Sequence, residues 1–205
     1  MNNFKKYVII CITTIILIIP IFFQVFIEYF TIRESNLTSI TVLILGISLL
    51  LLVGILIENF AYDSDLFELI KNHDLIDSFI NKEKRGLVLV FFSITMIMEE
   101  LIFRYYSIGI LNSLLNLNYY ISILISSLAF SIYHIHIWFS FKNLKLLLIN
   151  LIYPFLMGLY LGFIFLSYGY VSCFIGHYII AFSMHYSLYR RYNNKTLRIK
   201  FKKKV

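Results

Sequence analysis

The chain has 205 residues, of which 60% are hydrophobic and only 14% are charged, and its formal net charge is +7. A soluble domain is about half apolar and about a quarter charged. The composition therefore excludes a soluble globular domain, and it equally excludes a disordered chain and a disulfide-rich scaffold. A mean hydropathy of +0.83 predicts instead a polytopic membrane protein.

Six stretches of the chain are long and apolar enough for helices that cross a bilayer, which need about 20 residues each. They are residues 7–27, 39–57, 86–106, 119–139, 146–166 and 171–189. The first follows two lysines, but its apolar run is too long for a signal peptide and no small-residue cleavage site follows it. The sequence therefore predicts an all-α bundle of about six transmembrane helices.

The basic residues are distributed unevenly between the two sides of this bundle. With six spans, all but two of the 18 Lys and Arg residues lie on the side that holds both termini or in the connections on that side. The exceptions are Arg33, in the first connection, and Arg104, inside the third span. Because basic residues are retained in the cytoplasm, we expect a multi-pass protein of the cell membrane with both termini cytoplasmic. The basic tail, residues 191–205, is expected to contact anionic membrane lipids and no nucleic acid.

The long connection between the second and third spans is expected to form an amphipathic helix along the cytoplasmic interface. Its apolar residues recur at helical spacing on one face, and they are Leu66, Leu69, Ile70, Ile76 and Ile80. Packing of this face against the bundle is the expected role, with gating of a site as the alternative. The chain thus divides into residues 1–85, with two spans and this connection, residues 86–190, a helical core, and the tail.

Ionisable residues inside spans are costly in lipid and indicate function, and the third span contains three of them. Glu100 and Arg104 are four residues apart, so they share a helix face and are expected to pair. Glu99 points about 100° away around the helix. The pair neutralises one carboxylate and leaves Glu99 for another role, unless all three form a structural ion network.

Two later spans supply histidines. In an α-helix His134 and His136 point to nearly opposite faces, and His136 is expected at the membrane interface beside Trp138. His177 lies inside the last span, whereas His185 is expected near its cytoplasmic end. Isolated Cys173 is expected in the core.

Gly158 and Gly162 form a small-xxx-small pattern, which permits close contact between helices. The intramembrane carboxylates and imidazoles suit water activation by a general base with a stabilised oxyanion. If a metal is present, Glu99, His134 and His177 provide two imidazoles and a carboxylate for Zn²⁺, and metal-free chemistry is equally compatible. A small transporter is a further alternative, although no inverted repeat supports it.

The order and spacing of these residues resemble the CPBP intramembrane proteases, which include the type II CAAX prenyl endopeptidases, the Abi-type proteins and the lysostaphin resistance protein A-like proteins. The motifs of that family are E-E-x-x-x-R, F-x-x-x-H and H-x-x-x-N on successive helices. The matching residues here are Glu99, Glu100, Arg104, Phe130, His134 and His177. The resemblance covers about residues 86–190.

The resemblance implies an intramembrane endopeptidase that acts on membrane-associated peptides or proteins. It implies that Glu99 is the general base and works with His134 on the attacking water. It further implies that Glu100 and Arg104 hold the local geometry and that His177 stabilises the oxyanion. Members of the family have been described both as zinc enzymes and as metal-free glutamate proteases.

One position departs from the family pattern. Ala181 stands where the last motif has Asn, and loss of one oxyanion donor costs on the order of 10²- to 10³-fold in rate. The alternative to an active peptidase is therefore a catalytically silent relative that acts as a membrane scaffold, regulator or bacteriocin-immunity protein.

Overall fold

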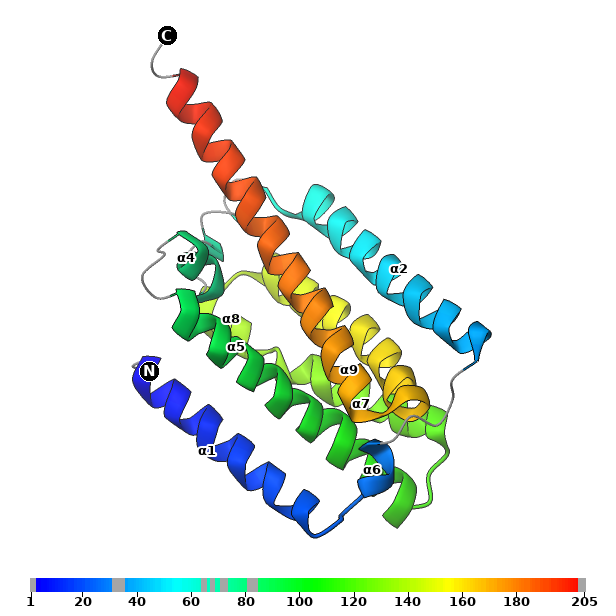
Figure 1. Cartoon of the computed structure of the whole chain (residues 1–205). Helices are drawn as coiled ribbons and strands as arrows, with labels where there is room; N and C mark the ends of the chain where they lie inside the picture. Colours follow the sequence, from blue (N-terminus) through cyan, green and yellow to red (C-terminus); the bar gives the residue numbers. More distant parts are fainter. Residues whose placement is uncertain are drawn as a thin grey trace.

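Figure 1 shows a computed structural model of the chain, which describes residues 3–30, 36–63, 66, 69–70, 74–80 and 85–202. The regular elements among these residues are all helices, as the sequence predicts. In chain order they are α1 (Asn3–Phe22), η1 (Ile27–Phe30), α2 (Leu37–Ala61), α4 (Asp74–Ile80), α5 (Arg85–Glu100), η3 (Leu101–Tyr106), α6 (Ser107–Gly109), η4 (Ile110–Leu114), α7 (Tyr119–Tyr133), α8 (His136–Phe141) and α9 (Leu144–Lys202).

Five helical stretches in the described part of the chain are long and apolar enough to cross a membrane. They are Lys5–Phe22, Leu37–Ala61, Arg85–Leu114, Tyr119–Phe141 and Leu144–Arg191. The last one has 48 residues, which at 1.5 Å per residue is about twice the thickness of a bilayer. It accommodates this length by folding back on itself, so the predicted fifth and sixth spans are its two arms. The protein is an all-α polytopic membrane protein.

The reversal inside α9 occurs at Gly169, whose φ of 79° and ψ of 178° are not helical. A residue with a Cβ rarely adopts this backbone region, so glycine is the residue that lets the chain turn. Beyond it the second arm returns along the first, and the Cys173 thiol lies 3.2 Å from the carbonyl oxygen of Leu161. Figure 1 shows the two arms, yellow and orange, as an antiparallel hairpin.

The first arm of α9 lies very close to α7, as the small-xxx-small pattern predicts. A Cβ on Gly158 would lie 3.1 Å from the Cα of Ser127, and a Cβ on Gly162 would lie 2.8 Å from Ile123. Backbones that approach this closely gain dispersion contacts along their length, which is the main attraction between helices in lipid. This contact holds α7, which ends directly before His134, against the first arm of α9.

Tyrosine hydroxyls connect the helices to one another by donating to backbone carbonyls. Tyr153 donates to Leu50 on α2 at 3.1 Å, and Tyr160 donates to Leu43 on the same helix. Tyr170, on the second arm of α9, donates to Ile97 on α5 at 3.1 Å. Buried hydroxyls need such partners, and these bonds position α2 and α5 around α9.

The connection after α2 packs against the bundle by its apolar face. Leu66, Ile70 and Ile76 are buried in one cluster with Leu146 and Leu188, from the two arms of α9, and Leu69 packs against it. The described helix of this connection is α4, Asp74–Ile80. Predictions that concern Arg33, Lys71, Lys82 and Lys84, or the side chains of Ile80 and most of the tail, lie outside the described residues.

Three spans differ from the predicted ones, and the first ends at Phe22 instead of residue 27. The third span continues beyond residue 106 to Leu114 through two π-helical segments, where Asn112 accepts a hydrogen bond from Ser122 at 2.6 Å. The fourth span is interrupted, because α7 ends at Tyr133 and α8 begins at His136. At the interruption the amides of His134 and Ile135 bond to carbonyls three residues back, as in a 3₁₀ turn.

Candidate active site

Three charged side chains of the third span lie inside the bundle, where α5 passes into the π-helical segment η3. Glu99, Glu100 and Arg104 are 5%, 0% and 0% exposed. Glu100 Oε1 and Arg104 Nη1 are 3.3 Å apart, so the predicted pair is present. π-Helical turns are rare and often occur at functional sites. Here one begins directly after the two glutamates.

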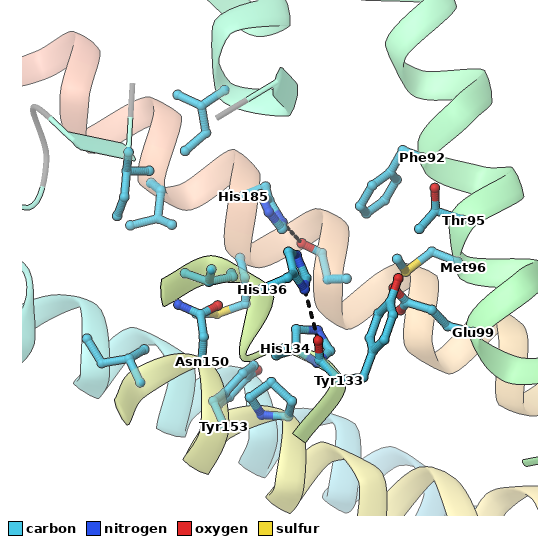
Figure 2. Close-up of a pocket in the computed structure, with 18 of the residues that line it drawn as sticks. Phe92, Thr95, Met96, Glu99, Tyr133, His134, His136, Asn150, Tyr153 and His185 are labelled. Atoms are coloured by element: carbon cyan, nitrogen blue, oxygen red, sulfur yellow. Dashed lines mark hydrogen bonds between the residues drawn. The ribbon is translucent and has the colours of Figure 1, made fainter. Parts of the chain in front are cut away.

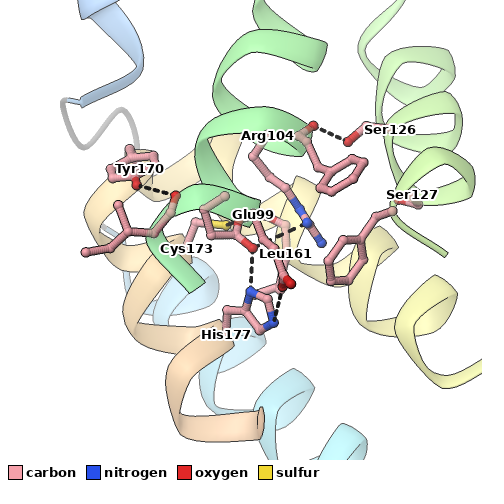
Figure 3. Close-up of polar contacts among 12 residues, drawn as sticks. Glu99, Arg104, Ser126, Ser127, Leu161, Tyr170, Cys173 and His177 are labelled. Atoms are coloured by element: carbon pink, nitrogen blue, oxygen red, sulfur yellow. Dashed lines mark hydrogen bonds and ion pairs between the residues drawn. The ribbon is translucent and has the colours of Figure 1, made fainter. Parts of the chain in front are cut away.

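His177 connects the two carboxylates from the second arm of α9. Its Nδ1 lies 2.6 Å from Glu100 Oε1, and its Nε2 lies 3.9 Å from Glu99 Oε2. Figure 3 shows the His177 ring beside Glu99. Ionised Glu100 can only accept a hydrogen bond, so Nδ1 carries a proton. The ring is thereby oriented with Nε2 toward Glu99, in the way that a carboxylate orients a catalytic histidine.

Cys173 and Phe130 complete the buried surroundings of these groups. The Cys173 thiol donates to Glu100 Oε2 at 2.8 Å, so the residue is buried as predicted but is not isolated. The guanidinium carbon of Arg104 lies 4.1 Å from the centroid of the Phe130 ring, a cation–π contact. The same ring meets His177 and His134 at right angles, with centroids 5.6 and 4.8 Å apart. Phe130 therefore separates Arg104 from the two histidines.

His134 occupies the interruption between α7 and α8. Its Nδ1 lies 2.8 Å from the carbonyl oxygen of Phe130, and because a carbonyl only accepts, Nδ1 carries the proton. In the neutral ring, Nε2 is then a hydrogen-bond acceptor and a base. The interruption thus presents the basic nitrogen of His134 away from the backbone.

A cavity of about 300 Å³ brings the candidate residues together. Glu99, His134 and His177 line it, and so does Ala181, the position at which the family motif has Asn. Glu100 and Arg104 do not line it. The predicted site residues are therefore divided between three that face the cavity and two that lie behind them.

Apolar side chains form most of the remaining cavity wall, and they come from α1, α2, α4, α5, α8 and α9. Figure 2 shows Phe92, Thr95 and Met96 beside Glu99 on one wall. Lys6 lines the cavity at the side of the bundle that holds the N-terminus. A mainly apolar space with polar groups at defined positions is typical of a site that binds an apolar or amphipathic ligand.

Several polar residues of this cavity were not predicted as site residues, and they are Tyr133, His136, Asn150 and His185. The prediction that His134 and His136 point to nearly opposite faces was wrong, because both line this cavity. In a 3₁₀ turn each residue advances about 120°, so two residues that would be opposed in an α-helix lie on adjacent faces. Their ring centroids are 6.0 Å apart. The interruption has no clear sequence signal, since neither glycine nor proline stands there.

His136 and His185 present their rings to the cavity as His134 does. His136 Nδ1 lies 2.9 Å from the carbonyl oxygen of Tyr133, and His185 Nδ1 lies 2.8 Å from that of Ala181. Each bond fixes the proton on Nδ1. His185, which is expected near the cytoplasmic end of its span, lines the cavity (Figure 2).

Two contacts relate the charged groups of the site. Arg104 neutralises Glu100 at 3.3 Å. An uncompensated buried charge is costly, and the group within reach of an ionised Glu99 is His177, whose Nε2 lies 3.9 Å from Oε2. A proton on His177 Nε2 would therefore compensate a charge on Glu99.

The donor set named for zinc is not arranged as a metal site. In the part of the chain that the structure describes, no three His, Cys, Asp or Glu side chains are grouped so that they could hold a metal ion. His177 Nδ1 is bonded to Glu100, and its Nε2 faces Glu99. The residues as placed do not fit a zinc ion.

The fold and the site define a polytopic membrane protein with a buried Glu–Arg–His network beneath an apolar cavity. A family model described as Type II CAAX prenyl endopeptidase Rce1-like matches residues 82–183, about half of the chain. The matched residues contain Glu99, Glu100, Arg104, His134 and His177. The chain belongs to this family of CAAX-protease-like membrane proteins. No curated protein and no solved structure is significantly similar to it.

Proposed function

We propose that the protein is an intramembrane endopeptidase that hydrolyses peptide bonds of membrane-associated peptides. The observation that carries the proposal is the convergence of Glu99, His134 and His177 on one apolar cavity. Membership of the family supports the reaction class. The apolar wall supports a substrate that carries hydrophobic residues or a hydrophobic group.

Glu99 is the general base of the proposed reaction. A water molecule between Glu99 and His134 attacks the carbonyl carbon of the scissile bond and gives a proton to the Glu99 carboxylate. The new C–O bond forms while the carbonyl π electrons move to oxygen. Collapse of the tetrahedral intermediate breaks the C–N bond, and the proton held by Glu99 passes to the leaving nitrogen. General acid–base catalysis of this kind contributes about 10²- to 10⁴-fold in rate.

His134 and His177 have different roles in this scheme. The Nδ1–H of His134 is bonded to the carbonyl of Phe130, so Nε2 accepts a hydrogen bond from the attacking water and orients it. His177 is protonated when Glu99 is ionised, and its Nε2–H then faces the cavity as a donor for the oxyanion. Glu100 and Arg104 hold His177 in that orientation through the 2.6 Å and 3.3 Å contacts.

The proposed orientation places both termini in the cytoplasm of a cell, with the protein in the plasma membrane. The basic residues of the sequence support it. The cavity extends from Glu99 to Lys6 and Tyr62, on the side of the bundle where α1 begins and α2 ends. A peptide would therefore enter from the cytoplasmic face of the bilayer.

Purified protein in liposomes, incubated with a library of membrane-associated peptides, tests this proposal. Mass spectrometry should find cleaved products with the wild type and none above background with Glu99→Gln or His134→Ala. Glu28→Gln, a glutamate of η1 outside the cavity, is the matched control and should cleave as the wild type does. Parallel reactions with a chelator report on metal dependence. Wild-type turnover by Glu99→Gln would contradict the proposal.

A silent relative is the second candidate, and Ala181 is the observation that favours it. Its methyl group lines the same cavity as Glu99 and cannot donate a hydrogen bond. A scaffold, regulator or bacteriocin-immunity protein would show its cellular phenotype unchanged by Glu99→Gln and lost on disruption of the close α7–α9 contact, for example by Gly158→Leu. A peptidase would lose its phenotype with Glu99→Gln.

A further inference from the structure

A hydrolase of amides needs hydrogen-bond donors directed at the oxygen that becomes charged. The Nδ1–H groups of His134, His136 and His185 are bonded to backbone carbonyls. Their Nε2 atoms are acceptors in the neutral rings, so these three histidines supply none.

The hydroxyls along most of the cavity are also occupied. Thr95 donates to the carbonyl of Phe91 at 2.8 Å, and Tyr153 donates to that of Leu50 at 3.1 Å. Lys6, Tyr7 and Tyr62, at the outer end of the cavity, have partners as well.

The amide of Asn150 is occupied in part and lies away from the reacting groups. It donates to Leu146 at 2.9 Å, and Figure 2 places it on the far side of His134 from Glu99. It is therefore no donor for an oxygen held beside Glu99.

Tyr133 differs from all of these residues. It is the last residue of α7, it lines the cavity, and its side chain is 37% exposed. Figure 2 shows its ring extending toward Glu99, with whose carboxylate the phenol interacts electrostatically. In the described part of the chain its hydroxyl makes no hydrogen bond. A tyrosine inside a bundle usually has a partner for its O–H, as Tyr105, Tyr153 and Tyr170 have here.

Packing holds the Tyr133 ring in this direction. Its centroid is 5.4 Å from that of Phe103, 5.6 Å from that of His134 and 5.5 Å from that of His136. Three aromatic neighbours restrict the ring to a narrow range of positions, so the hydroxyl is preorganised at little entropic cost in the reaction.

We propose that the Tyr133 hydroxyl donates a hydrogen bond to the oxyanion of the tetrahedral intermediate, beside His177, in place of a side-chain amide at position 181. This role rests on the proposed peptidase function. The hydroxyl keeps its proton throughout. Its hydrogen bond stabilises the negative charge that forms on the carbonyl oxygen when water adds to the carbonyl carbon. This charge disappears when the C=O bond re-forms and the C–N bond breaks. A neutral phenol serves this purpose in other enzymes that form oxyanions.

The test compares Tyr133→Phe with the wild type on a peptide found in the library assay. Removal of one oxyanion donor should lower kcat about 10²-fold and leave KM nearly unchanged. Tyr160→Phe is the matched control, because this tyrosine lies outside the cavity and donates to Leu43; its kcat should stay at the wild-type value. Wild-type kcat in Tyr133→Phe, or an equal loss in Tyr160→Phe, would overturn the inference.

Rescue from position 181 separates a chemical role from a structural one. Ala181→Asn places an amide in the cavity that Tyr133 lines. The double variant Tyr133→Phe/Ala181→Asn should therefore have a kcat about tenfold or more above that of Tyr133→Phe alone. The ketone analogue of the substrate, which forms a tetrahedral hydrate, should bind Tyr133→Phe about 10²-fold more weakly than it binds the wild type, while the peptide itself binds equally well. No recovery together with unchanged affinity for the ketone would overturn the inference.

If Tyr133→Phe fails to fold, a second variant still tests the role of the hydroxyl. Tyr133→Ala removes the ring, and added phenol should raise its kcat whereas toluene should not; equal effects of the two compounds would count against the role. Failure of the proposed function itself has a different signature, since wild type and Glu99→Gln would then be equally inactive. An active wild type, an inactive Glu99→Gln and an unaffected Tyr133→Phe would reject the role of Tyr133 alone.

Discussion

The two faces of the third helix carry similar residues in opposite situations. Behind the cavity, Glu100 is 0% exposed and receives Arg104, His177 and the Cys173 thiol. On the cavity side, Glu99 faces His177 at 3.9 Å and has one carboxylate oxygen with no hydrogen bond among the described residues. Of these adjacent glutamates, Glu100 is therefore a fixed counter-ion, and Glu99, with fewer such contacts, is left for the proposed role of base. The difference lies in how many donors reach each one.

The largest expected effect comes from breaking the buried pair. Glu100→Gln leaves Arg104 as an uncompensated buried charge, which should lower the free energy of unfolding by about 3–5 kcal/mol. Denaturant unfolding in mixed micelles measures it. Glu100→Gln combined with Arg104→Met removes both charges and should recover most of the loss. Equal instability of the double variant would show that the charges themselves are not the cause.

Glu99→Gln should separate function from stability. The amide keeps the shape of the side chain but cannot take a proton, so kcat should fall by about 10²- to 10⁴-fold. Because the carboxylate lacks the donors that Glu100 has, the unfolding free energy should change far less than in Glu100→Gln. Paired measurements of kcat and unfolding check the contrast. A similar loss of stability in both variants would place Glu99 in the structural network.

Gly169→Ala is expected to have an intermediate effect. A Cβ at φ 79° and ψ 178° strains the backbone by about 1–3 kcal/mol, and the strain falls on the turn that begins the second arm of α9, on which His177 lies. Thermal unfolding should report this loss. Gly86→Ala, where a Cβ has open space, is the matched control and should leave stability unchanged. A neutral Gly169→Ala would mean that the turn adjusts without strain.

The smallest effect is expected at the exposed pair of Lys145 and Asp63. Their atoms are 3.0 Å apart, but the side chains are 48% and 55% exposed. Solvent screens such pairs, so Lys145→Ala should cost less than about 1 kcal/mol. The same unfolding assay as for Glu100→Gln gives a direct comparison. If Lys145→Ala lowered the unfolding free energy as much as Glu100→Gln does, the exposed and the buried ion pair would not differ in their contribution to stability.

The amino-acid pattern predicted the helical class, the span positions and the Glu100–Arg104 pair, because each depends on hydrophobicity or on spacing along one helix. It also indicated the close α7–α9 contact from Gly158 and Gly162. It did not predict the approach of Cys173 to Glu100, since that contact exists only once Gly169 has reversed the chain.

The other residues that the sequence did not predict lie in the cavity wall. His136 reaches the cavity because the helix is interrupted at residues 134 and 135, where bonds to carbonyls three residues back replace those of an α-helix. Helical periodicity assumes an unbroken helix, so it assigned His136 to the opposite face. Neither glycine nor proline stands at the interruption, so the local pattern contains no signal of it. Tyr133 lines the cavity as the last residue of α7, but no motif distinguishes it from the other tyrosines of the sequence.

The reversal at Gly169 has a consequence for how this architecture varies. Asn150 and Met157, on the first arm of α9, line the cavity together with His177 and Ala181, on the second. Both stretches belong to one continuous hairpin, so the tip at Gly169 sets the register between them. Changes in length at the hairpin tip would move the two cavity walls relative to one another. An insertion at the tip is therefore expected to alter the cavity more than single substitutions along the arms.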